Sequence, residues 1–244
     1  MRSQADIDAV LDLACTGRSA HAISRETTIP VTTVRRWMHG RVPNPPARFE
    51  ITSLPAPEYS YLLGLYLGDG HIAAWRKGLW HLRISCDGAY PDIVAAAKEA
   101  IAAVRGPAAI TTRSIPDSRC LLVQSLWRHW PEAFPQHGPG RKHTRVIRLT
   151  EWQEEIVGRA REALVRGLIH SDGSRYVARQ RSSNGKIYTY PRYGFSNRSG
   201  DIRDLLCAQL DALGISWTQP GPYDIAIARR ADVAAVDAFV GPKR

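Results

Sequence analysis

Residues 62–70 are Leu62-Leu63-Gly64-Leu65-Tyr66-Leu67-Gly68-Asp69-Gly70, and residues 165–173 repeat the pattern as Val165-Arg166-Gly167-Leu168-Ile169-His170-Ser171-Asp172-Gly173. The offset from Gly64 to Gly167 and from Asp69 to Asp172 is 103 residues in both cases. Each nonamer ends an apolar stretch of helical pattern, and alternating residues typical of a β-hairpin follow it. A repeat in register predicts two copies of one structural unit.

Later stretches repeat as well. Ser85-Cys86-Asp87 comes before a predicted helix that starts at Asp92, and Ser196-Asn197-Arg198 comes before one that starts at Asp201. We therefore expect helix, hairpin, helix, two strands and helix (αββαββα) in each half, and an α+β fold class. The second hairpin is the longer, since Gly70 to Ser85 spans 15 positions and Gly173 to Ser196 spans 23.

The spacing of small residues predicts how the two nonamer helices pack. Gly64 and Gly68 lie four apart on one helix face, as do Gly167 and Ser171 on the other. Small residues allow two helix backbones to approach more closely than the usual 8–10 Å, which brings Asp69 and Asp172 together. Two neighbouring carboxylates repel each other unless a cation lies between them, and Mg²⁺ prefers oxygen ligands. Both acids are therefore candidate metal ligands and catalytic residues.

The paired nonamers resemble those of the LAGLIDADG (DOD-type) homing endonucleases, over nearly all of residues 58–241. The resemblance implies a pseudo-twofold two-repeat monomer in which the hairpins form a saddle over the DNA major groove. It also implies that the last acid of each nonamer holds divalent metal ions. The sixth nonamer position, often Asp in the family, is Leu67 in one copy and His170 in the other. We expect Leu67 to pack and His170 to be a hydrogen-bonded structural residue.

The first forty residues predict a small helical unit. Ile7, Val10, Leu11 and Ala14 form one apolar helix face, Ser19 can cap a second helix, and a third runs from Val31 to Met38. The segment from Ser19 to Arg41 resembles the helix-turn-helix of resolvases and invertases. Ile29, Val34 and Trp37 then take buried positions, while the residues left to contact DNA are Thr32, Thr33, Arg35, Arg36, His39 and Arg41.

Charge favours a nucleic-acid partner. The chain has 33 Lys and Arg against 23 Asp and Glu, a net charge of +10, and only five of the 33 are lysines. Arginine binds phosphates bidentately, although GC-rich codon usage also raises the arginine content. The segments 174–198 and 137–149 carry six and four basic residues and no acid. Further candidate DNA contacts are Arg76, Lys77, Arg141, Lys142, Arg175, Arg179, Arg181, Lys186 and Arg192.

Other classes are disfavoured. The four cysteines are far apart and form no zinc or redox motif, so we expect reduced, buried thiols. Apolar runs of about ten residues are too short for a membrane helix, and no signal peptide is readable, so a cytoplasmic, nucleoid-associated protein is expected. The predicted domains are a helix-turn-helix (1–42), a Pro-rich linker (43–57), a first repeat (58–136), a basic inter-repeat linker (137–150) and a second repeat (151–244).

The sequence thus predicts a monomer that binds specific double-stranded DNA, not a small-molecule substrate. Lys77 and Lys186, in the two hairpins, are candidates for the basic side chain that the family places near the metals. Mg²⁺-dependent phosphodiester cleavage is the sharper hypothesis. A transcription regulator that kept the fold and lost cleavage is the alternative. An RNA-binding protein is a weaker alternative, because a helix-turn-helix and a paired saddle both fit B-form major grooves.

Overall fold

The structure is a computed structural model that describes residues 3–42, 49–106, 110–181, 183 and 185–241. The chain divides into two compact units, residues 1–49 and 50–244. The boundary falls inside the predicted linker 43–57, of which residues 43–48 lie outside the described residues. Within the described part of the chain, no helix has the length and apolar character needed to cross a membrane.

The first unit is a bundle of three helices, α1 (Gln4–Cys15), α2 (Ala20–Thr27) and α3 (Val31–Met38). The Ser19 side chain accepts a hydrogen bond from the Ala22 N–H at the start of α2, as its capping position predicts. Ile29, Val34 and Trp37 are buried, together with Ile7, Val10 and Ile23. The predicted helices and core positions of this unit are therefore confirmed.

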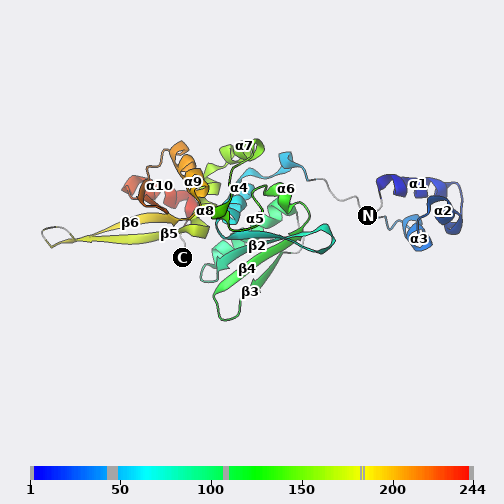
Figure 1. The fold of residues 1–244 in the computed structure, drawn as a ribbon, viewed down its shortest axis with the longest axis horizontal. Coiled ribbons are helices and arrows are strands. Elements are labelled where there is room, and N and C mark those ends of the chain that lie inside the picture. Colours follow the sequence, from blue (N-terminus) through cyan, green and yellow to red (C-terminus); the bar gives the residue numbers. More distant parts are fainter. Residues whose placement is uncertain (1–2, 43–48, 107–109, 182, 184, 242–244) are drawn as a thin grey trace. The chain divides into compact units, whose positions relative to one another are not determined.

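The second unit consists of two α/β halves (Figure 1). The first half contains α4 (Ala56–Asp69), β1 (Gly70–Ala74), β2 (Trp80–Asp87), α5 (Pro91–Arg105), β3 (Ile110–Ser114), β4 (Cys120–Trp127) and α6 (Trp130–Ala133). The second half contains α7 (Glu151–Arg159), α8 (Arg161–Asp172), β5 (Gly173–Arg181), β6 (Ile187–Ser196), α9 (Gly200–Ala212), β7 (Thr218–Gly221), β8 (Asp224–Ile227) and α10 (Arg230–Val240). Short 3₁₀ turns occur at Ile51–Ser53, Arg76–Gly78 and Lys142–Thr144.

Each half has one four-stranded antiparallel sheet, with strand orders β1-β2-β4-β3 and β5-β6-β8-β7. The order of helices and strands is the predicted one in both halves, with α7 added before the second, and the α+β class is confirmed. The β5–β6 hairpin extends as a long arm, longer than β1–β2, as the spacing predicts (Figure 1).

The core lies between the sheets and the helices. Residues 59–67 of α4 are all buried, which fits a helix that is apolar on every side. Cys86 and Cys207 are buried as expected, Cys120 is half-buried, and Cys15 is exposed. The prediction of a buried thiol was wrong for Cys15, because it is the last residue of α1 and lies outside the core of the bundle.

Candidate functional site

Helices α4 and α8 are in direct backbone contact. A Cβ atom added at Gly64 would lie 2.6 Å from the Leu164 carbonyl oxygen, and one at Gly167 would lie 2.3 Å from the Tyr61 carbonyl oxygen. At Gly68 an added Cβ would lie 2.1 Å from Ser171 Oγ. Only residues with small or no side chains fit at this crossing, so the two helices meet along the residues whose spacing predicts it.

The two acids are the last residues of these helices. Asp69 ends α4 and Asp172 ends α8, and the next residue in each case, Gly70 or Gly173, begins a strand. An added Cβ at Gly68 would be only 2.9 Å from Asp172 Oδ2, so this carboxylate lies against the end of the opposite helix. The crossing therefore places an acid from each half near the same end of the helix pair.

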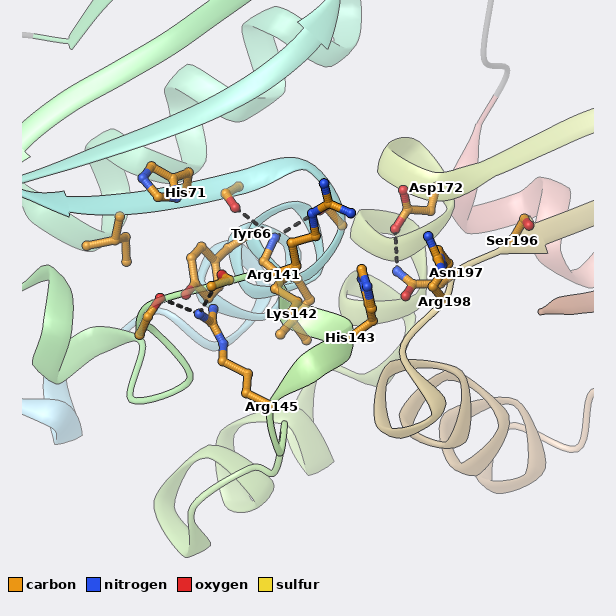
Figure 2. A pocket seen from close by; sticks show the side chains of 16 residues that line it. Tyr66, His71, Arg141, Lys142, His143, Arg145, Asp172, Ser196, Asn197 and Arg198 are labelled. Carbon is orange, nitrogen blue, oxygen red and sulfur yellow. Dashed lines mark hydrogen bonds between the residues drawn. The ribbon is translucent and has the colours of Figure 1, made fainter. Parts of the chain in front are cut away.

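Each acid has a neighbour from the end of a strand in its own half. The Asn197 side-chain amide donates a 2.7 Å hydrogen bond to Asp172 Oδ2 (Figure 2). Burial, and secondarily the charge of Asp69, raises the pKa of the Cys86 thiol to about 12. Cys86 and Asn197 occupy matching places in the sequence repeat, so the two acids have different surroundings.

Asp172 borders a cavity of about 500 Å³ that is lined mainly by cationic and polar groups (Figure 2). Residues 137–150, called the connector here, join the two halves and form one wall. The side chains that line the cavity from the connector are Arg141, Lys142, His143 and Arg145, and those from elsewhere include Tyr66, His71, Ser196, Asn197 and Arg198. Asp69 borders a second cavity, of about 310 Å³, together with Ser85, Asp87 and Tyr90.

Lys142 lines the first cavity and contacts the end of α4. Its ammonium group donates hydrogen bonds to the carbonyl oxygens of Gly68 (2.9 Å) and Gly70 (2.7 Å), on both sides of Asp69 in the chain. It also lies 5.1 Å from the centre of the Tyr66 ring. Burial lowers the pKa of Lys142 to about 8, although Asp172 and Asp69 act to raise it. At pH 7 Lys142 is therefore mostly charged and is the cation beside the two acids.

The hairpin lysines do not reach this place. Lys77 lies at the tip of the first hairpin with a φ of 61°, and Lys186 lies near the tip of the second; neither lines the cavity. The basic residue beside the acids comes instead from the connector, which the sequence analysis assigned to DNA contact alone.

Other predicted contact residues have varied surroundings. Arg175 is held by Asp237 of α10 through two hydrogen bonds of 2.7 and 2.8 Å, and Tyr193 donates a third to the same carboxylate. The Arg175 guanidinium is therefore engaged in an intramolecular ion pair with Asp237. Arg76 lies over the Trp75 ring, and Arg179 and Arg181 are exposed. In the first unit Thr32, Arg35, Arg36, His39 and Arg41 are exposed, Thr33 is half-buried, and Arg35 contacts His21.

His170 has the structural role expected of it. Its Nδ1 lies 2.9 Å from the Tyr61 hydroxyl, its Nε2 lies 3.0 Å from the Val240 carbonyl oxygen, and the ring is buried. The contact ties α8 to α4 and to the end of α10. Leu67 is fully buried, as expected.

The donor set around the acids fits Mg²⁺ in one respect. Mg²⁺ is commonly held by one or two carboxylates, with waters and substrate phosphates completing its six ligands, and Asp69 and Asp172 supply hard oxygens of that kind. Among the described residues, no group of three or more His, Cys, Asp or Glu side chains is placed to hold a metal. Any metal here thus depends on the two acids together with backbone, water or substrate oxygens.

Sequence reasoning missed His71, His143, Arg145, Asn197 and Arg198 as residues of the site. The sequence contained a signal for Asn197, because it occupies the position in the second repeat that Cys86 occupies in the first, at the end of the hairpin that follows each nonamer. Arg145 lay in the basic run of the connector, where it hydrogen-bonds the Gly138 carbonyl and orders the turn.

No family model and no curated protein matches the chain. Among solved structures, the chain is similar to the LAGLIDADG meganuclease I-AabMI bound to uncleaved DNA, with a TM-score of 0.48 and 9% identity over 74% of this chain and 82% of that one. It is similar to the I-SmaMI homing endonuclease bound to cleaved DNA, with a TM-score of 0.49 and 9% identity over 75% and 83%. For I-LtrWI bound to target DNA, the values are 0.46 and 9% over 80% and 83%. The structural neighbours of this chain are LAGLIDADG homing endonucleases.

Proposed function

We propose that the protein binds double-stranded DNA at a specific sequence and cleaves its phosphodiester bonds with Mg²⁺ held by Asp69 and Asp172. The observation that supports this most is the pairing of two acids, at the ends of helices in backbone contact, with a cavity lined by connector cations. A phosphodiester is an anionic substrate that uses both features, because carboxylates hold the metal and cations bind the phosphates.

The residues of the site have separate tasks in this proposal. Two of the three N–H donors of Lys142 bind the carbonyl oxygens of Gly68 and Gly70, which leaves one for a phosphate oxygen or a water. Arg141 and Arg198 line the cavity and attract the DNA backbone. Asn197 donates to Asp172 and so fixes the orientation of that carboxylate. Mg²⁺, when bound, would activate a water and stabilise the leaving oxygen.

The helix-turn-helix and the hairpins bind DNA in this proposal. In the first unit, α3 enters a major groove with Thr32, Thr33, Arg35 and Arg36, while His39 and Arg41 bind phosphates. The two halves of the second unit act together as a pseudo-twofold saddle in a monomer. Arg76, Lys77, Arg179, Arg181, Lys186 and Arg192 contact the duplex from the hairpins.

A regulator that binds DNA without cutting is the second candidate, and three observations favour it. Asp172 already accepts a hydrogen bond from Asn197, and Lys142 brings a positive charge to the acids without any metal. Within the described residues, moreover, the two acids have no third acidic, histidine or cysteine ligand. The two candidates share DNA binding and differ in metal chemistry.

Cleavage assays on a plasmid library separate them. Purified protein is incubated with the library with and without Mg²⁺, next to the variants Asp69→Asn and Asp172→Asn. Asp117→Asn is the matched control, because Asp117 lies in an exposed turn with a φ of 57°, which asparagine tolerates. We expect Mg²⁺-dependent cleavage by wild type and the control, and binding without cleavage by the two site variants. Binding without cleavage by wild type would leave only the regulator.

A further inference from the structure

The two sheets present different chemistry on their solvent-facing sides. In each sheet the helices cover the face that carries the buried residues, such as Leu82, Ile84 and Val123 in the first and Phe195 and Ile225 in the second. Because side chains alternate along a strand, the residues between these lie on the other side, called the open face here. Residues paired across neighbouring strands share a face, so the register identifies the residues of each open face.

The open face of the first sheet is rich in hydrogen-bonding groups. His71 pairs with Arg83, Arg83 with Gln124, and Gln124 with Thr111, so one row of polar residues crosses all four strands. Within the described part of the chain, Arg83 Nε is buried without a hydrogen-bond partner.

The matching row of the second sheet has no guanidinium, imidazole or amide side chain. Ser174 pairs with Gly194, Gly194 with Ala226, and Ala226 with Thr218. The Tyr176 ring lies across the glycine, since an added Cβ at Gly194 would be 3.3 Å from its Cε1 atom. Aromatic surface therefore covers the place where the first sheet offers a guanidinium and an amide.

Tyrosines continue along the open face of the second hairpin. Tyr190 pairs with Ala178 and Tyr188 with Gln180, and the rings of Tyr188 and Tyr190 stack with their centres 6.4 Å apart. Tyr176, Tyr188 and Tyr190 are each more than 40% exposed. These three residues form the tyrosine stripe.

Charge indicates what covers the stripe. Arg192 pairs with Tyr176 and so lies on the face of the stripe, whereas Arg175, Arg179 and Arg181 lie on the opposite face. Residues 174–198 contain no acid on either face, so an acidic polymer is favoured over a neutral or basic partner. A two-stranded antiparallel ribbon such as β5–β6 fits the major groove of B-form DNA. In that groove thymine presents a 5-methyl group, which binds apolar side chains, whereas guanine and adenine present acceptor and donor pairs that suit Arg and Gln.

On the basis of the proposed DNA-binding function, we propose that the two sheets read different base chemistry in the two halves of the target. The first open face reads purine edges through Arg83 and Gln124. The second reads thymine methyl groups through the tyrosine stripe, and its half of the target is rich in A·T pairs.

Replacing thymine by deoxyuridine tests this directly, because the change removes only the methyl group. Bound duplexes are first selected from a random library with the full-length protein in EDTA, and each half of the selected site is then made with deoxyuridine. We expect affinity to fall about fourfold for each contacted thymine in one half, as expected for one buried methyl group, and to change little in the other.

Variants assign the sensitive half to the stripe. Tyr188→Ser/Tyr190→Ser should bind the thymine and deoxyuridine sites nearly equally. The control Val177→Ser/Ile187→Ser alters exposed apolar residues on the opposite face of the same hairpin and should keep the discrimination.

The possible failures are distinguishable. If no duplex is selected, the proposed function fails and this inference fails with it. If a site is selected but deoxyuridine has no effect, or has equal effects in both halves, or if the tyrosine variant still discriminates, this inference alone is overturned. If the tyrosine variant sediments differently from wild type but still distinguishes thymine from deoxyuridine, the stripe binds protein and not thymine. That outcome also overturns this inference.

Discussion

Asp69 and Asp172 each end a helix of the α4–α8 pair with a carboxyl group. Replacing one of these groups tests metal binding without a cleavage assay. Replacing Asp69 by Asn keeps the shape of the side chain and removes the charge that attracts the ion. We expect wild type to melt at a higher temperature in Mg²⁺, because a ligand that binds only the folded state stabilises it. Asp69→Asn should lose this increase and, freed of carboxylate repulsion, melt slightly higher without metal.

The measurement is thermal melting of wild type, Asp69→Asn and the Asp117→Asn control, each with and without Mg²⁺ and then Ca²⁺. If wild type gains no stability from either ion even with DNA bound, the metal site is absent and the regulator is the better description.

Lys142 gives a prediction about pH. Its folded pKa of about 8 lies below the 10.5 of a free lysine, so between these values the unfolded chain binds more protons than the folded one. The contribution of Lys142 to the free energy of unfolding therefore rises with pH in this window, and below pH 8 the full cost of burying its charge is present. Relative to Lys142→Met, wild type should gain about 2 kcal/mol between pH 7 and pH 10.

Denaturant unfolding of both proteins in EDTA, at four or five pH values, checks the prediction. The difference between them is the useful quantity, because other lysines and tyrosines titrate in both. A difference that stays constant with pH contradicts the burial of a charged Lys142.

The sequence predicted the two acids of the site but not Lys142, the basic residue beside them. Asp69 and Asp172 are in sequence positions that a repeat and a helix period can identify. Lys142 is 74 residues from Gly68, and its contact depends on how the connector folds over the ends of α4 and α8. No local pattern encodes a contact of that range, so Lys77 and Lys186, which lie in the hairpins after each nonamer, were the natural candidates.

At the scale of elements, the crossing of α4 and α8 sets the positions of both acids. Gly64→Ala adds a methyl group at 2.6–2.8 Å from backbone atoms of Leu164, Gly167 and Leu168, which cannot move independently of their helix. We expect a loss of about 3 kcal/mol in the free energy of unfolding, at the upper end of the usual cost of overpacking.

Gly158→Ala is the matched control. Gly158 is also within a helix, α7, but its added Cβ would meet only an Arg161 side-chain nitrogen at 3.8 Å. Here alanine should stabilise by about 0.5–1 kcal/mol, because glycine is the poorer helix former. Equal effects at the two sites in denaturant unfolding would show that the helices do not touch through Gly64.

The strands were predicted less completely than the helices. Arg175, Arg179 and Arg181 alternate with Tyr176, Ala178 and Gln180 along the sequence, which predicts one basic face of the second hairpin, and the register agrees with this. That face is continuous with the buried Tyr193 and Phe195, so it is the side that α10 covers near the base of the hairpin, and Arg175 pairs with Asp237 there. Sequence alternation separates two faces but does not say which of them a helix will cover.

At the scale of the whole molecule, the charge of +10 predicts strong salt dependence. Each phosphate neutralised releases counterions, so the logarithm of DNA affinity should fall linearly with the logarithm of salt concentration, with a slope of about −0.9 per phosphate contact. A slope near zero between about 50 and 200 mM salt contradicts the DNA-binding proposal.

The two units should contribute separately to this slope. A fragment of residues 50–244, which contains one complete compact unit, should show a smaller slope and a footprint shortened at one end. Arg35→Gln/Arg36→Gln in the full chain should do the same. A footprint equal to that of the full protein would mean that the first unit does not read DNA.

The site depends on the connector, the segment that links the two halves covalently. Lys142 belongs to neither nonamer, and it reaches the carbonyl oxygens at the end of α4 only because residues 137–150 pass from one half to the other beside them. A dimer built from two copies of either half alone would bring two acids together but would have no such crossing and no lysine beside them. Chimaeras that exchange one half for that of another protein must therefore keep the connector together with its own α4, because the contact between Lys142 and α4 is lost when they are separated.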